Sequence, residues 1–169
     1  MADARPEAAP DRDAIRRVLE QAFAPSGAEA RLVDALRADA DLVPELCLVA
    51  EEGGKVVGHI AYSRARLESG HEVLALAPMG VLPERQRDGI GSALVRESLE
   101  RAAGTTFPLV VVLGHPEYYP RFGFEPGAAF GVVDPYGAPP EAWMAHRLPS
   151  YTPEARGMVT YAEAFSLVE

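Results

Sequence analysis

The spacing of apolar residues near the start of the chain predicts two helices. Apolar positions recur at every third or fourth residue across 15–23, which is the spacing of a helix buried along one face. Pro25 ends that segment. Ser26 and Glu29 then have the spacing of a capping box, which predicts a second helix continuing through Leu36.

Three predicted strands follow these helices. Residues 46–51 and 56–63 are short runs rich in apolar residues, and the glycines within 52–55 predict a hairpin turn between them. A longer apolar run over 71–82 predicts the third strand. The central part of the chain is therefore expected to form an antiparallel meander.

The second half of the chain predicts a crossover between two parallel strands. Residues 90–103 return to helical spacing, and 109–113 is a continuous β-branched run that is typical of a buried strand. The last β segments are expected at 142–148 and 158–161, with a proline-rich loop before them. This order of elements predicts an α/β (α+β) fold with a mixed sheet flanked by helices.

Composition narrows the possible roles of the chain. Its 169 residues suit a single domain over 1–169, with 1–10 expected to be a flexible tail. A net charge of −9 argues against a nucleic-acid partner. No apolar run has the length of a membrane span and no leader is recognisable, so we expect a cytoplasmic protein without a membrane partner. Cys47 is the only cysteine and is expected to be a buried thiol, and the histidines show no metal-ligand spacing.

A glycine turn joins the third strand to the third helix. It reads Gln86-x-x-Gly89-x-Gly91, and backbone N–H groups at such a helix start can hold a phosphate or diphosphate. Arg85 and Arg87 add positive charge. An ordinary tight turn is the alternative. The loop is neither a dinucleotide-binding fingerprint, which needs a third small residue where Leu94 stands, nor a Walker A loop, which needs a lysine after the second glycine.

Two further stretches carry candidate chemistry. Pro78 and Gly80 interrupt the strand before the turn, so the backbone around Met79–Val81 is expected to have groups unpaired in the sheet. After the 109–113 strand comes Tyr119-x-x-x-Gly123-Phe124. A helix and a strand separate this pattern from the glycine turn, and the two patterns together are far more specific than either alone.

These motifs resemble those of the GNAT superfamily of N-acetyltransferases, and the stretches around them look like its YhbS-type bacterial branch. The resemblance covers nearly the whole chain and implies a GNAT acyltransferase fold, with a mostly antiparallel sheet splayed between two parallel strands. It implies acetyl-coenzyme A as cosubstrate, with no metal. The coenzyme-binding residues that it implies are Met79, Gly80, Val81, Gln86, Arg87, Asp88, Gly89, Ile90, Gly91 and Ser92.

The resemblance also implies the reaction. A primary amine of a small molecule or peptide attacks the thioester directly, and Tyr119 protonates the departing thiolate, with neighbouring Tyr118 as the alternative for that role. Plain aromatic packing is the other interpretation of Tyr119. The general base is open among Glu84, His115 and Glu117. The chain is expected to be a monomer or a homodimer.

Two other functions remain as alternatives to catalysis. One is a non-catalytic acyl-coenzyme A sensor or regulatory protein, and the other is a domain that binds a different phosphate ligand. Asp88 departs from the family pattern, because a carboxylate beside phosphates is unfavourable unless it points outward or pairs with an arginine.

Overall fold

The hydrogen-bonded order of the strands confirms the mixed sheet that the sequence predicts. In the computed structural model, which describes residues 2–168, the strands follow the order β1-β2-β3-β4-β5-β8-β6, and β9 pairs with both β3 and β7. Most pairs are antiparallel. β4 and β5 pair in parallel through Leu74–Val110 and Ala75–Val111. The strands are β1 (Asp3–Pro6), β2 (Leu48–Glu52), β3 (Lys55–Leu67), β4 (Glu72–Val81), β5 (Leu109–Leu113), β6 (Glu125–Pro126), β7 (Val132–Val133), β8 (Trp143–Arg147) and β9 (Gly157–Thr160).

The described residues divide into two compact units, whose boundaries fall inside β3 and β4. One unit holds the chain up to Ser63, then Ala77–Arg101, and again the residues from Glu163 onward. The other holds Arg64–Leu76 and Ala102–Ala162. Organisation as a single domain over 1–169 stays a prediction, and Met1 and Glu169 lie outside the described residues.

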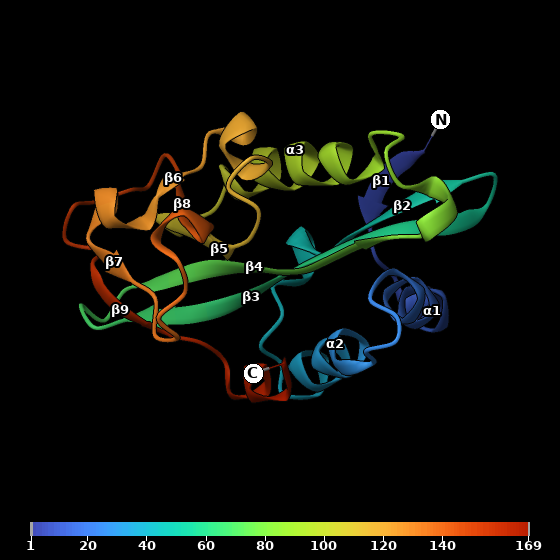
Figure 1. Cartoon of the computed structure of the whole chain (residues 1–169), viewed down its shortest axis with the longest axis horizontal. Helices are drawn as coiled ribbons and strands as arrows, with labels where there is room; N and C mark the ends of the chain where they lie inside the picture. Colours follow the sequence, from blue (N-terminus) through green and yellow to red (C-terminus); the bar gives the residue numbers. More distant parts are fainter. Residues whose placement is uncertain (1, 169) are drawn as a thin grey trace. The chain divides into compact units, whose positions relative to one another are not determined.

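In the first unit, helices cover both faces of the strands. Figure 1 shows α1 (Arg12–Ala22) and α2 (Ala28–Ala38) on one face and α3 (Ile90–Ala102) on the other. A glycine in a strand faces the helices on each side of the sheet. A Cβ at Gly80 would lie 3.1 Å from a methyl of Leu19 in α1, and a Cβ at Gly58 would lie 3.1 Å from Ile90 in α3. The three predicted helices are therefore present close to their expected positions.

The predicted capping box of α2 does not form. The N-cap residue is Gly27, and the Ser26 hydroxyl accepts a hydrogen bond from the Ala28 N–H at 3.2 Å. Oε1 of Glu29 is buried and has no hydrogen-bond partner in the described part of the chain. The helix begins later than the serine–glutamate spacing requires, so the two side chains cannot cap each other's backbone.

The expectation of a flexible tail over 1–10 is wrong for the segment Asp3–Pro6. This segment forms β1 and pairs antiparallel with β2. Arg5 holds it in place, because its guanidinium lies 2.8 Å from Asp11 and 3.4 Å from Glu51. Local composition suggested a loose segment, whereas the pairing with β2 and the ion pair with Glu51, both distant in sequence, order it.

The second unit has its own core beneath β5 and β8. Leu109, Val111, Trp143 and Ala145 are all buried there, and Trp143 Nε1 donates a hydrogen bond to the Val132 carbonyl at 3.0 Å. The predicted strands at 109–113, 142–148 and 158–161 are confirmed as β5, β8 and β9. Where the sequence predicts a long loop, the structure also has the two-residue strands β6 and β7.

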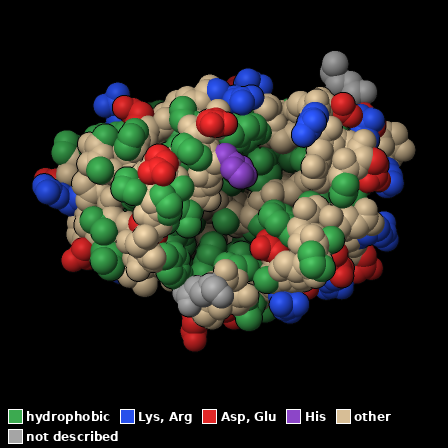
Figure 2. Space-filling view, in the orientation of Figure 1, with side chains coloured by type: hydrophobic (Ala, Val, Ile, Leu, Met, Phe, Trp, Pro, Cys, Tyr) green, Lys and Arg blue, Asp and Glu red, His purple; other side chains and the backbone are tan. Residues whose placement is uncertain are grey.

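The surface of the chain carries both signs of charge. Figure 2 shows Lys and Arg side chains interspersed with Asp and Glu side chains on the face that it draws. Among residues 2–168, no helix combines the length and the apolar character needed to cross a membrane. Cys47 is buried, as predicted, and its thiol lies 3.4 Å from the Val43 carbonyl.

Candidate functional site

The loop between β4 and α3 is anchored at both of its ends. Leu82 is buried directly after β4, and its N–H donates to the Val57 carbonyl of β3 at 2.9 Å. A short 3-10 turn, Pro83–Arg85, follows. The Gln86 side chain then donates to the Val81 carbonyl at 3.1 Å, which closes the loop onto the end of its own strand. The Gln86 side chain thus has a structural contact within the loop.

Left-handed backbone turns the loop into the helix. Arg87 has φ +69° and Gly89 has φ +82°, a region that glycine adopts without strain. The Gly89 carbonyl accepts the first helical hydrogen bond, from Ala93 at 3.0 Å. Ile90 and Gly91 therefore lie in the first turn of α3, where N–H groups have no acceptor within the helix. No atom lies within 4 Å of the position a Gly89 Cβ would occupy, so the loop backbone is open on that side.

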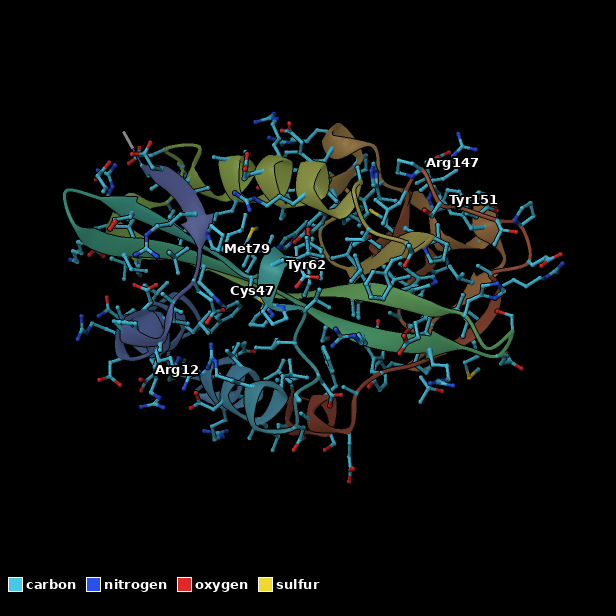
Figure 3. All side chains as sticks on the ribbon, turned by 180° about the vertical axis from the view of Figure 1, so that it is seen from behind. Arg12, Cys47, Tyr62, Met79, Arg147 and Tyr151 are labelled. Carbon is cyan, nitrogen blue, oxygen red and sulfur yellow. The ribbon has the colours of Figure 1, made fainter. Side chains whose placement is uncertain are left out.

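The start of α3 is held against β3 by close packing and one buried hydrogen bond. Ile90 and Leu94 are buried over Gly58, whose missing side chain allows their approach. Further along the helix, the Tyr62 hydroxyl lies 2.7 Å from Ser98 Oγ; Figure 3 labels Tyr62 in the middle of the sheet. Sequence reasoning missed Gly58, because a glycine inside a strand carries no signal about which helix will cover it.

The predicted backbone segment Met79–Val81 forms the last residues of β4, immediately before the loop. Gly80 has α1 on its open side, so its lack of a side chain is explained by helix packing. Because successive residues of a strand face opposite sides, Met79 lies on the side of α3, as Figure 3 shows. The role of these backbone groups toward a ligand stays a prediction.

The charges of the loop are not equivalent. Arg85 Nη2 lies 2.7 Å from Glu52 Oε2 and 3.6 Å from Asp88 Oδ2. Asp88 is therefore within ion-pair distance of an arginine, which is one of the two conditions stated above, and its role toward a bound phosphate stays a prediction. Arg87 is exposed, and within residues 2–168 no carboxylate lies within 4.0 Å of it in an ion pair.

Tyr119 lies in the second unit, on a 3-10 turn over Tyr119–Phe122. It is 7% exposed, and its ring packs against Gly114, where a Cβ would lie only 2.4 Å from Cε2. Phe124 contacts it edge to face, with 5.4 Å between ring centroids. Burial raises the pKa of Tyr119 to about 12, and the neighbouring Tyr118 adds to the rise. Gly114 is a second residue that sequence reasoning did not single out.

The other candidate residues of the reaction are more accessible. Tyr118 is half-buried, and the Arg121 guanidinium lies over its ring, 4.9 Å from the centroid. Glu84, His115 and Glu117 are all exposed. Of the two tyrosines, Tyr119 is the buried one, and its assignment as the catalytic group stays a prediction. In the described part of the chain, no group of three or more His, Cys, Asp or Glu side chains could hold a metal ion.

Comparison with known proteins places the chain in a class of acetyltransferases. A family model described as "Acetyltransferase (GNAT) domain" matches residues 44–126. The Escherichia coli K12 protein YjhQ, described as an uncharacterized N-acetyltransferase, is 38% identical over 160 residues, covering 90% of this chain and 88% of YjhQ. The chain belongs to the GNAT family.

Solved structures narrow the family to the YhbS-type bacterial branch that the sequence predicted. YhbS from Escherichia coli, crystallised in complex with CoA, is 32% identical with a TM-score of 0.89, and the match covers 98% of this chain and 92% of YhbS. A GNAT family acetyltransferase from Brucella melitensis, in complex with acetyl-CoA, is 36% identical with a TM-score of 0.80, and the match covers 98% of each chain.

Proposed function

We propose that the chain is an N-acetyltransferase that moves an acetyl group from acetyl-coenzyme A to a primary amine. The observation that carries this proposal is the left-handed backbone of Arg87 and Gly89 just before α3, with open space beside Gly89. Such a loop suits the diphosphate of coenzyme A, because first-turn N–H groups and the helix dipole both favour an anion. The similarity to relatives crystallised with CoA and acetyl-CoA supports the same ligand.

The proposed site combines the loop with the end of β4. Residues Gln86–Ser92 bind the diphosphate through their backbone, with Arg87 adding positive charge. The backbone of Met79–Val81 pairs with the amides of the pantetheine arm, as an added strand does. An N–H of the same segment stabilises the oxyanion that forms when the amine attacks the thioester.

The amine must be neutral when it attacks. A free alkylammonium has a pKa near 10.4, so about 1 molecule in 2,500 is neutral at pH 7, which corresponds to roughly 4.6 kcal/mol of barrier. A general base or a desolvated acceptor pocket has to offset this cost. Glu84, His115 and Glu117 remain the candidates for the base.

We propose that Tyr119 assists the departing thiolate chiefly as a hydrogen-bond donor. With a pKa of about 12, its phenol stays neutral and keeps its proton at working pH. An alkyl thiol has a pKa of about 8.5, below that of this phenol, so the thiolate accepts a hydrogen bond from Tyr119 more readily than its proton. In the balanced reaction, the nitrogen gives up a proton to the general base or to water as the amide forms. The C–S bond breaks to a thiolate that accepts a hydrogen bond from Tyr119 and then takes a proton from water.

The direct test is an acetyl-transfer screen across amine classes, namely polyamines, aminoglycosides, amino acids and peptide N-termini. Release of free coenzyme A together with an acceptor heavier by one acetyl group is the expected result. Tight binding of acetyl-coenzyme A with no acetylated product in any class would favour the sensor reading instead. Thermal stabilisation by nucleotides but not by coenzyme A would favour a different phosphate ligand.

A further inference from the structure

We infer that Glu52 is a positioning residue for the coenzyme-binding loop. By holding Arg85, it fixes the loop to the β2–β3 hairpin and leaves Arg87 as the cation that meets the diphosphate. This inference rests on the proposed function. It assigns Arg85 to positioning the loop and Arg87 to binding the diphosphate. Sequence alone treats them as equivalent.

The first step is the geometry of the ion pair. Arg85 Nη2 lies 2.7 Å from Glu52 Oε2, well within the range of a charge-assisted hydrogen bond. The side chains are 34% and 27% exposed, so water screens this pair less than it screens a pair on an open surface. Glu52 is separated from Arg85 by all of β3 and β4, and the contact joins two distant segments.

The second step is that the loop contacts the β2–β3 hairpin at two places. Glu52 is the last residue of β2 and faces Lys55 across a turn made by Gly53 and Gly54. The loop has another tie to the same hairpin, because the Leu82 N–H donates to the Val57 carbonyl of β3. The Leu82–Val57 hydrogen bond holds the beginning of the loop, and the Glu52–Arg85 ion pair holds the segment that leads into its left-handed turn.

The third step is the charge available to an anion. Arg85 Nη2 is shared by two carboxylates, since Asp88 Oδ2 also lies 3.6 Å from it. One cation between two anions leaves this triad with a formal net negative charge, so it does not attract a phosphate. Arg87 is exposed and has φ +69°, and no ion pair holds it among the described side chains. It is the loop arginine that can turn to a ligand.

The experiment is a double-mutant cycle on coenzyme A affinity, measured by calorimetry, with acetyl-transfer kinetics beside it. Both E52Q and R85Q should weaken coenzyme A binding about tenfold, with KM for acetyl-coenzyme A rising in parallel and kcat unchanged. The double variant should be no weaker than either single one, because each removes the same tie. E52D, which keeps the charge, should recover part of the affinity.

R87Q tests the other half of the inference. It should also weaken binding, additively with E52Q, and it should flatten the dependence of affinity on salt, because it removes a phosphate contact. R85Q should leave that salt dependence close to that of the unmodified protein. E97Q, which breaks the exposed Glu97–Arg101 pair on α3 at 3.1 Å, is the matched control and should change nothing.

Amide hydrogen exchange of the unliganded protein separates this inference from the proposed function. Amides 86–92 should exchange faster in E52Q and R85Q than in E97Q. If the unmodified protein does not bind coenzyme A, the proposed function fails. The exchange data then still show whether the Glu52–Arg85 ion pair orders the loop. Unchanged exchange in E52Q, or additive losses of affinity in E52Q and R85Q, would overturn the positioning role.

Discussion

Gly58 of β3 and Ile90 of α3 are in contact because no side chain stands between them. A Cβ on Gly58 would lie 3.1 Å from Ile90 Cγ2 and 3.2 Å from Leu94 Cδ1. Both distances are shorter than most contacts that a real Cβ atom makes with packed neighbours. Since Ile90 is the first residue of α3, this contact sets how closely the candidate phosphate loop approaches the sheet.

Replacing Gly58 by valine should therefore push the start of α3 away from β3. We expect a loss of about 1–3 kcal/mol of stability from overpacking, together with a higher KM for acetyl-coenzyme A. G58A should show the same changes at smaller size. Urea unfolding and steady-state kinetics measure both effects, and normal KM in a folded G58V protein would contradict the link between the packing and the loop.

Replacing Gly89 by valine should abolish coenzyme A binding and leave the protein folded. There is room for the side chain, but φ +82° is strained for a residue with a Cβ, and the new group would cover the open backbone. G70V is the matched control, since Gly70 has φ +91° and equally empty surroundings in a turn outside the site. Calorimetry should show lost binding for G89V alone; comparable binding in both variants would contradict the loop assignment.

Replacing Tyr119 by phenylalanine should lower kcat by about 100-fold with little change in affinity for acetyl-coenzyme A. The ring still fills its place against Gly114 and Phe124, so only the hydroxyl is lost. Y118F serves as the comparison, because the structure leaves that ring half-buried. Unchanged kcat in Y119F and reduced kcat in Y118F would transfer the role to the neighbouring tyrosine.

Alkaline pH should destabilise the protein in part through Tyr119. Its pKa is raised to about 12 in the folded protein, against about 10 for an unfolded tyrosine. The unfolded state therefore ionises first. The contribution is complete below about pH 10 and is lost as pH rises toward 12, amounting to at most about 3 kcal/mol. Urea midpoints at pH 8 and pH 11 should differ less in Y119F than in the unmodified protein.

Acidic pH should destabilise the folded protein in part through Glu7. Burial alone raises the pKa of this carboxyl, but His59 and Arg37 outweigh burial and bring it below its usual value. Its contribution is thus present above the unfolded pKa of about 4.3 and is lost as pH falls through the lower folded value. Removing the charge of this mostly buried partner in E7Q should cost about 3 kcal/mol at pH 7 and should flatten stability below pH 5.

Much of the fold follows from short-range patterns. The helical spacing at 90–103 and the β-branched run at 109–113 predict α3 and β5 almost to the residue, because each pattern is uninterrupted and its ends are marked by glycine or proline. The capping box at Ser26 was wrong, since its spacing is short and a helix start can move by a residue or two.

What the sequence could not predict depends on partners far along the chain. β1 is ordered by its pairing with β2 and by the contact of Arg5 with Glu51, and no local pattern predicts either. In the candidate site, the glycine spacing identified the loop, but the pairing of Arg85 with Glu52 needed the hairpin in three dimensions. Gly58 and Gly114 are inconspicuous in the sequence for the same reason.

The protein has one cysteine, and burial raises the pKa of that Cys47 thiol to about 12. Chromogenic disulfide reagents react with thiolates, so the Cys47 thiol should not react with them for as long as the protein is folded. In an acetyl-transfer assay, the colour formed with such a reagent should then measure released coenzyme A, without a contribution from the protein's own thiol. Because Cys47 is buried, its rate of labelling also reports how often the protein opens, and a ligand that binds the folded protein should slow it.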